Sequence, residues 1–205
     1  MDFDQVIFQR IYNFLAKKKK KDLSASPYQV QLTDIRARLL ILARAISGDP
    51  VDLLSSEREG GWKDESLYLP AQCDLYDSLT LNANFYLFRI FYLATQRNMA
   101  LNWSSREQHD TVVSQAKAAE TSSLVIEKVM EEYPLLAPIL DELKQGLEDQ
   151  VSAENPDPDY TWLYGRWMRN SAAYENKKDL QNVSDHTFGV NSVTAETEIK
   201  AKQAE

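Results

Sequence analysis

Apolar residues recur at intervals of three and four along most of this 205-residue chain, the spacing of helices that bury one face. Between Leu79 and Leu93 nearly every position is apolar, so this segment is predicted to be a central helix surrounded by neighbouring elements. The same periodicity predicts helices over residues 2–18, 33–46, 77–97, 105–132 and 134–150.

One segment departs from the helical pattern. Gly60-Gly61 permits a tight turn, Leu67-Tyr68-Leu69 alternates in the manner of a strand, and Pro70 stops that strand. These residues predict a small β-hairpin near residues 57–69. The predicted fold class is therefore mainly α, a helical bundle with one small β-hairpin inserted between helices.

Capping residues predict where two of the helices begin and end. Thr33 is positioned to cap the helix over residues 33–46, and Gly48-Asp49-Pro50 is expected to end it. Ser105 with Gln108 resembles a capping box, which predicts that the helix after the central one begins near residue 105.

The chain is predicted to form one domain followed by a tail. The Pro- and Asp-rich residues 154–159 predict a turn or linker, and the aromatic residues of 162–168 predict a short helix that docks back on the bundle. Beyond Asn170, apolar residues are sparse and no period is sustained. We therefore expect a helical domain over residues 1–169 and a flexible tail over 170–205, which would link to a missing C-terminal domain.

Composition narrows the possible partners and compartment. The net charge of -8 argues against nucleic acid as a partner, because phosphate binding needs clustered Lys and Arg. The single cysteine, Cys73, excludes an internal disulfide and suits a reducing compartment, so we expect a cytoplasmic protein. Asn82, Asn84 and Arg89 interrupt the long apolar run, which argues against membrane insertion.

The residue spacings contain no recognisable catalytic or cofactor-binding set. His109 and His186 are the only histidines, and neither zinc-site spacing nor a phosphate-binding loop occurs. Carboxylates such as Glu127, Glu131 and Asp141 do fall on two successive predicted helices. One alternative is therefore a stand-alone helical metalloenzyme, and another is an unrelated helical scaffold or regulatory protein. The interpretation we favour is a non-catalytic protein with no cofactor and no metal.

Trp62 is the candidate interaction residue. It lies beside Gly60-Gly61 on the predicted hairpin and is flanked by Lys63 and Asp64. An exposed tryptophan on a rigid turn can anchor an interface, so Trp62, Lys63 and Asp64 are predicted to bind a partner. The alternative is that Trp62 folds back onto the bundle and belongs to the core.

The hairpin segment and the helix after it resemble a known family. The residues that carry the resemblance are Gly60-Gly61-Trp62-x-Asp64-x-x-Leu67-Tyr68-Leu69-Pro70, Asp74-Leu75-Tyr76 and Leu81-Asn82-x-Asn84-x-Tyr86-x-Phe88. They are similar to the N-terminal region of the nitric-oxide-reductase activation protein NorD and of its Rubisco-activation relative CbbO. The resemblance is strongest over residues 57–95.

The resemblance implies a partner function. Members of this family are accessory proteins of MoxR-type AAA+ ATPases and couple the ATPase to a client enzyme for remodelling or cofactor insertion. They also carry a C-terminal von Willebrand factor A domain with a metal site, and this chain has no counterpart of that domain. The implied function is a non-catalytic adaptor, with a MoxR-type ATPase and a client enzyme as its partners.

Overall fold

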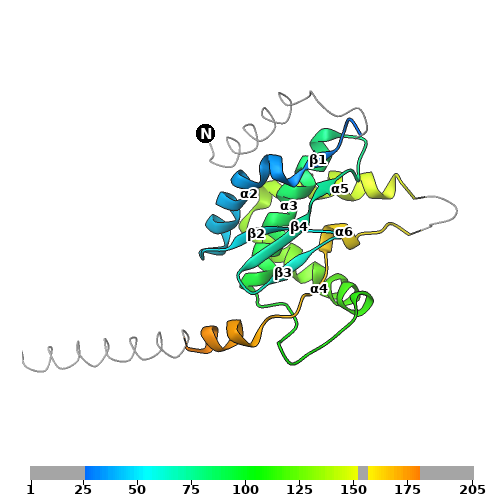
Figure 1. Ribbon diagram of the computed structural model, residues 1–205. Coiled ribbons are helices and arrows are strands. Elements are labelled where there is room, and N and C mark those ends of the chain that lie inside the picture. Colours follow the sequence, from blue (N-terminus) through cyan, green and yellow to red (C-terminus); the bar gives the residue numbers. More distant parts are fainter. Residues whose placement is uncertain (1–25, 152–156, 181–205) are drawn as a thin grey trace, which may run out of the picture.

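The computed structural model describes residues 26–151 and 157–180, so the predicted helix over residues 2–18 and the end of the predicted tail lie outside the described residues. Helix α3 (Leu79–Asn98) runs through the middle of the molecule and is buried along almost its whole length (Figure 1). The prediction of a central helix is confirmed. The helices that pack against it are α2 (Leu32–Ser47), α4 (Thr111–Glu132), α5 (Ala137–Glu148) and the short α6 (Thr161–Tyr164).

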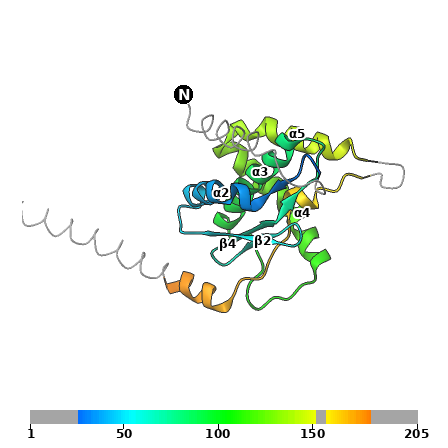
Figure 2. The ribbon, with the colours of Figure 1, turned by 45° about the horizontal axis from the view of Figure 1, so that its top comes forward.

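Two small sheets complete the fold. The strands are β1 (Val30–Gln31), β2 (Asp52–Ser56), β3 (Gly61–Lys63), β4 (Ser66–Pro70) and β5 (Gln72–Cys73). The larger sheet has the order β2-β4-β3, and β1 pairs with β5 in the smaller one. Figure 2 shows the larger sheet on one side of the molecule, with α3 and then α5 above it in that view. A 3-10 turn, η1 (Pro134–Leu136), leads into α5.

The predicted hairpin is present, but the fold is not a pure bundle. β3 and β4 form this antiparallel hairpin, and Trp62 lies opposite Leu67 in it. β2 adds a parallel neighbour to β4 that the sequence analysis missed. Leu53 is its one buried residue, so β2 shows no alternation that a sequence pattern could register. The fold is mainly α with some β, and the single-hairpin description was too simple.

Side chains from α2 cover the outer edge of β2. Arg36 Nε donates to the carbonyl oxygen of Leu53 at 2.8 Å, and Arg44 Nε donates to that of Val51 at 3.0 Å. Unpaired backbone groups on an edge strand invite pairing with other chains. The two arginines satisfy carbonyl groups at this edge and tie β2 to α2.

Two helix boundaries differ from the predictions. α2 ends at Gly48, as expected, but Gln31 and not Thr33 occupies its N-cap position. α4 begins at Thr111, where Asp110 caps it, and not near Ser105. The predicted capping box is wrong because the loop before α4 closes a turn of its own, in which Ser104 donates to the Glu107 carboxylate.

The first part of the predicted tail contacts the domain. Residues 172–180 are helical, and the ring of Tyr174 lies 6.4 Å from that of Trp62. Lys177 pairs with Glu65 in the turn of the β3–β4 hairpin. None of the helices in the described residues combines the length and hydropathy that crossing a bilayer requires.

Candidate binding cleft

Trp62 belongs to the core. Its side chain is only 1% exposed, and its Nε1–H donates to the carbonyl oxygen of Leu101 at 3.0 Å. The expectation of an exposed anchor is therefore wrong for this side chain, and the alternative, that Trp62 folds back onto the domain, is the arrangement observed. Leu101, just after α3, and Tyr174 in the C-terminal segment both contact its side chain.

Asp64 joins the hairpin to the C-terminal segment. It occupies the turn between β3 and β4 with a φ of 54°. Its backbone N–H donates to Asn170 Oδ1 at 2.9 Å, and its carboxylate accepts from the backbone N–H of Ser171 at 2.7 Å. Lys63, the residue before it, lines a surface cleft. Partner binding through Lys63 and Asp64 stays a prediction.

The glycines beside Trp62 allow two backbone segments to cross at close range. Gly60 has a φ of +70°, and a Cβ there would lie 2.1 Å from the backbone oxygen of Tyr68. A Cβ on Gly61 would lie 2.2 Å from the backbone oxygen of Arg166. The carbonyl oxygen of Gly60 accepts from the Arg166 N–H at 3.0 Å. Gly60-Gly61 is thus a crossing point, while the hairpin turn itself lies further on, at Asp64.

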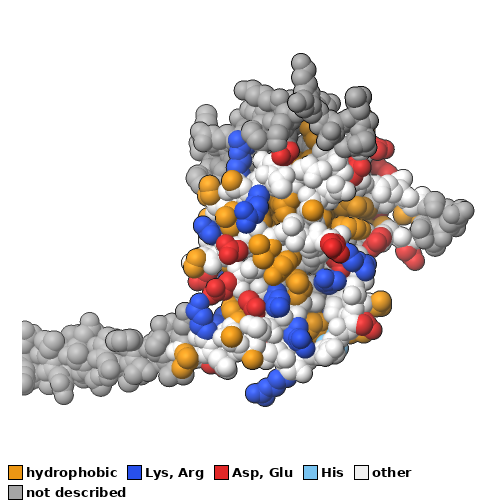
Figure 3. All heavy atoms as spheres, viewed as in Figure 1, with side chains coloured by type: hydrophobic (Ala, Val, Ile, Leu, Met, Phe, Trp, Pro, Cys, Tyr) orange, Lys and Arg blue, Asp and Glu red, His pale blue; other side chains and the backbone are white. Residues whose placement is uncertain are grey.

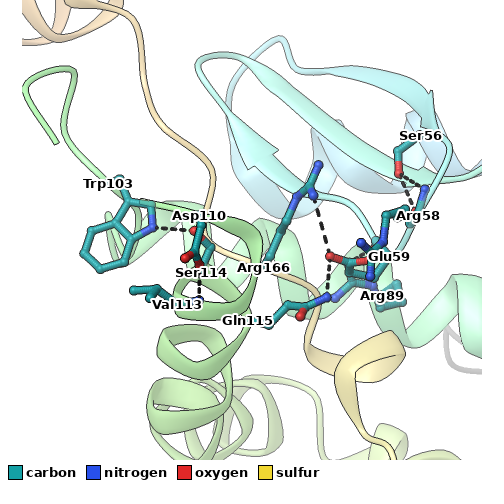
Figure 4. Close-up of polar contacts among 10 residues, drawn as sticks. All are labelled: Ser56, Arg58, Glu59, Arg89, Trp103, Asp110, Val113, Ser114, Gln115 and Arg166. Atoms are coloured by element: carbon teal, nitrogen blue, oxygen red, sulfur yellow. Dashed lines mark hydrogen bonds and ion pairs between the residues drawn. The ribbon is translucent and has the colours of Figure 1, made fainter. Parts of the chain in front are cut away.

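A buried carboxylate lies next to this crossing. The side chain of Glu59 is 2% exposed and has Arg58 at 3.3 Å and Arg166 at 3.8 Å (Figure 4). Gln115 of α4 donates to the same carboxylate at 3.0 Å. Arg89 of α3 donates to the backbone oxygen of Glu59. One carboxylate therefore lies among three guanidinium groups, which leaves an excess of positive charge here.

A cleft of about 390 Å³ opens on the surface beside this cluster. Residues from four segments line it: the end of β3, the loop before α4, the first turn of α4 and the C-terminal segment. We call it the basic-aromatic cleft and define it by Lys63, Trp103, His109, Arg166, Trp167 and Arg169. Figure 4 shows Asp110 and Ser114 at the start of α4, with Trp103 and Arg166 on either side.

Backbone hydrogen bonds hold the walls of the cleft in place. Trp103 N–H donates to the Met168 oxygen at 3.2 Å, and Asn170 N–H donates to the Trp103 oxygen at 3.0 Å. Trp167 N–H donates to the Ser114 oxygen at 3.1 Å, which fixes the same segment to α4. The cleft is therefore built on paired backbone, and its side chains start from defined positions.

Aromatic rings form one side of the cleft. The rings of Trp103 and His109 lie 3.9 Å apart and are tilted by 33°, and Trp167 meets Trp103 edge-on at 4.9 Å. Trp103 Nε1–H donates to Ser114 Oγ at 3.1 Å. The Nε1–H of Trp167 is shielded from solvent and has no acceptor among the described residues. The wall thus has stacked apolar faces and one unused donor.

Cations dominate the rest of the cleft. Lys63, Arg166 and Arg169 line it, against the single carboxylate of Asp110. That carboxylate is already engaged, because it accepts from the Val113 N–H at 2.8 Å. Figure 3 shows Lys and Arg side chains over the lower part of the body, where β3 and α4 lie in the same view. On a chain with a net charge of -8, this is a local basic site.

No sequence pattern predicted this cleft. Of its residues, only Lys63 was among the predicted partner-binding residues. No role was predicted for Trp103, and Trp167 was expected only in the short aromatic helix over residues 162–168. No local pattern joins them, since Trp103 and Arg169 are brought together by an isolated parallel bridge between distant segments. The one available signal was the positive charge within residues 166–169 of an acidic chain.

Asn82 explains part of the motif that follows the hairpin. It is fully buried, and its Oδ1 accepts from the backbone N–H groups of Leu75 and Tyr76 at 3.0 and 3.1 Å. Its Nδ2 donates to the backbone oxygens of Tyr28 and Tyr76 at 2.9 and 2.7 Å. A single amide thus ties two loops to α3, which is a structural role.

Cys73 is expected to react slowly with thiol reagents in the folded protein. Burial raises the pKa of its thiol to about 12, although the Leu75 N–H partly opposes this. At pH 8 its thiolate fraction is then about a thousandfold below that of a free cysteine. Iodoacetamide labelling followed by mass spectrometry measures this, with the denatured protein as the control. Equal labelling rates in the two states would contradict the buried position.

The acidic residues considered as metal ligands are not brought together. Glu131 and Glu132 both lie near Lys128, at 2.8 and 3.3 Å. Within residues 26–151 and 157–180, no group of three or more His, Cys, Asp or Glu side chains is arranged to hold a metal ion.

The basic-aromatic cleft is the candidate binding site among the described residues, and the crossing at Gly60-Gly61 lies beside it. Comparison of the chain with protein-family models, with curated proteins and with solved structures gave no match.

Proposed function

We propose that this chain is a non-catalytic adaptor domain of a MoxR-type AAA+ ATPase system. It links the ATPase to a client enzyme in the cytoplasm, for activation of that enzyme or insertion of its cofactor. The observation that carries the proposal is the basic-aromatic cleft. Aromatic and Arg side chains around a cleft are typical of recognition surfaces.

The positions of the family-like residues support the proposal indirectly. Gly60, Trp62 and Asn82 have packing or hydrogen-bonding roles, and Tyr86 donates from its hydroxyl to the Pro70 oxygen at 2.9 Å. The resemblance over residues 57–95 therefore concerns residues that build a fold. The side chains around these residues are then the ones available for partner contacts. Lys63, which lies between Trp62 and Asp64 of the motif, is the one that also lines the cleft.

Binding to a MoxR-type ATPase encoded in the same genome tests the proposal. The immobilised chain should bind the ATPase saturably, with a dissociation constant of about 10 μM or lower. Biolayer interferometry gives this constant, and an assay of phosphate release shows whether the chain alters the ATPase rate. The chain alone should release no phosphate from ATP.

A charge variant remote from the cleft serves as the control. Lys144→Gln removes one positive charge from α5, which does not line the cleft, and should leave ATPase binding unchanged. Failure of the wild-type chain to bind the ATPase, or ATP turnover by the chain itself, would refute the adaptor function.

A further inference from the structure

Two cations of the basic-aromatic cleft have no ion-pair partner among the described residues. Lys63 is half-buried and Arg169 is exposed, and neither has a carboxylate in contact within that part of the chain. Arg166 shares the Glu59 carboxylate with Arg58, which lies nearer to it. A cleft with this much unneutralised positive charge favours an anionic ligand.

The ligand also has to suit an aromatic wall. Trp103 and Trp167 meet at 4.9 Å, and Met168 lies beside them in the lining. An anionic group with an apolar or aromatic neighbour meets both requirements.

The first turn of α4 favours a carboxylate over a phosphate. Backbone N–H groups at a helix start attract phosphate, but here the Asp110 carboxylate already accepts from the Val113 N–H. A doubly charged phosphate would face that carboxylate at close range. The net charge of -8 also disfavours a long polyanion such as nucleic acid, whereas a short segment senses mainly the charges within a Debye length, about 8 Å.

We infer that the basic-aromatic cleft binds an acidic segment of a protein partner, in which Asp or Glu side chains flank an aromatic or apolar residue. Lys63 and Arg169 pair with the carboxylates, and Arg166 adds a planar guanidinium suited to a two-point contact. The apolar residue of the segment lies against Trp103 and Trp167. The inference rests on the proposed function in taking the ligand to be part of a protein.

Fluorescence anisotropy with a labelled peptide of about eight residues, mostly Glu and Asp around one Phe, tests the inference. The wild-type chain should bind it saturably, and added salt should weaken the binding. Lys63→Gln combined with Arg169→Gln should weaken it at least about tenfold, because two partner charges are lost. Neither side chain has a bonding role in the described structure, so the melting temperature should not change. Lys144→Gln, which removes one positive charge from α5 away from the cleft, is the control and should bind like the wild type.

Any of the following results would overturn the inference: no saturable binding by the wild-type chain up to about 1 mM peptide, equal affinity in the double variant, or equal affinity for the same peptide with Gln and Asn in place of Glu and Asp. Tighter binding of an oligothymidylate of the same length would also overturn it, in favour of a nucleic-acid site.

The double variant separates this inference from the adaptor proposal. If that variant loses the peptide but still binds the ATPase, the cleft serves another partner and the adaptor function stands. If the wild-type chain binds the peptide but not the ATPase, the adaptor function fails and the cleft assignment stands.

Discussion

Gly60→Ala is expected to destabilise the protein by about 4 kcal/mol or more, because strain and a backbone collision act together. The residue has a φ of +70°, where a Cβ is unfavourable, and the added carbon would lie 2.1 Å from the Tyr68 oxygen. Tyr68 lies opposite Gly61 in the β3–β4 pair, so it cannot retreat without breaking the hairpin. Urea unfolding followed by circular dichroism measures the change in free energy.

Gly48→Ala is the matched control for this experiment. Gly48 has almost the same φ, +69°, but a Cβ there meets nothing within 4 Å. It should therefore show only the conformational cost of the left-handed region, about 1 kcal/mol. If Gly60→Ala and Gly48→Ala lose similar stability, the collision between the added Cβ and the Tyr68 oxygen does not contribute to the effect at Gly60.

Arg89→Met is the second substitution with a large expected effect, a loss of about 3–5 kcal/mol. Arg89 is fully buried in α3 and donates to the backbone oxygens of Leu163 and Glu59 at 3.0 and 2.8 Å. Burial lowers the pKa of its guanidinium to about 10, and nearby Tyr92 and Glu59 oppose that shift, so it is charged at neutral pH. Methionine fills a similar volume but leaves both oxygens without their donor.

Arg58→Met tests whether the stability loss in Arg89→Met comes from removing a positive charge near Glu59, and not from leaving two carbonyl oxygens without a donor. Arg58 contacts the Glu59 carboxylate at 3.3 Å, but its own side chain is 61% exposed. Its removal should lower stability by only about 1 kcal/mol, because Arg166 and Gln115 still contact the buried Glu59 carboxylate and no backbone oxygen loses its donor. Thermal melting of both variants at pH 7 separates the two cases, and a larger loss for Arg58→Met than for Arg89→Met would contradict this account.

Both sensitive positions hold the C-terminal segment against the domain. Gly60 accepts from Arg166 through its carbonyl oxygen, and Arg89 binds the carbonyl of Leu163 in α6. The same segment continues into one wall of the basic-aromatic cleft. The stability of this crossing therefore also sets how well the cleft is formed.

Local pattern in the sequence was sufficient for most of the helices. α3 could be predicted because it is apolar on nearly every face, and Gly48 marked the end of α2 because a left-handed residue there suits glycine. The alternation in Leu67-Tyr68-Leu69 likewise reported the strand of the hairpin that packs on the core. These features depend on residues within one or two turns of each other, which is the range that periodicity can report.

Only the tertiary structure decided the sheet and the cleft. β2 takes its place through pairing with β4 and through the arginines of α2, and neither leaves a periodic signal. Trp62 was ambiguous in the sequence, because a tryptophan after two glycines can be exposed or covered, and residues 101 and 174 decide that it is covered. Lys63, Trp103 and Arg169 lie far apart along the chain and line one cleft, and a backbone bridge joins Trp103 to Arg169. Such contacts depend on the path of the whole chain, so the candidate site became visible only once the segments were brought together.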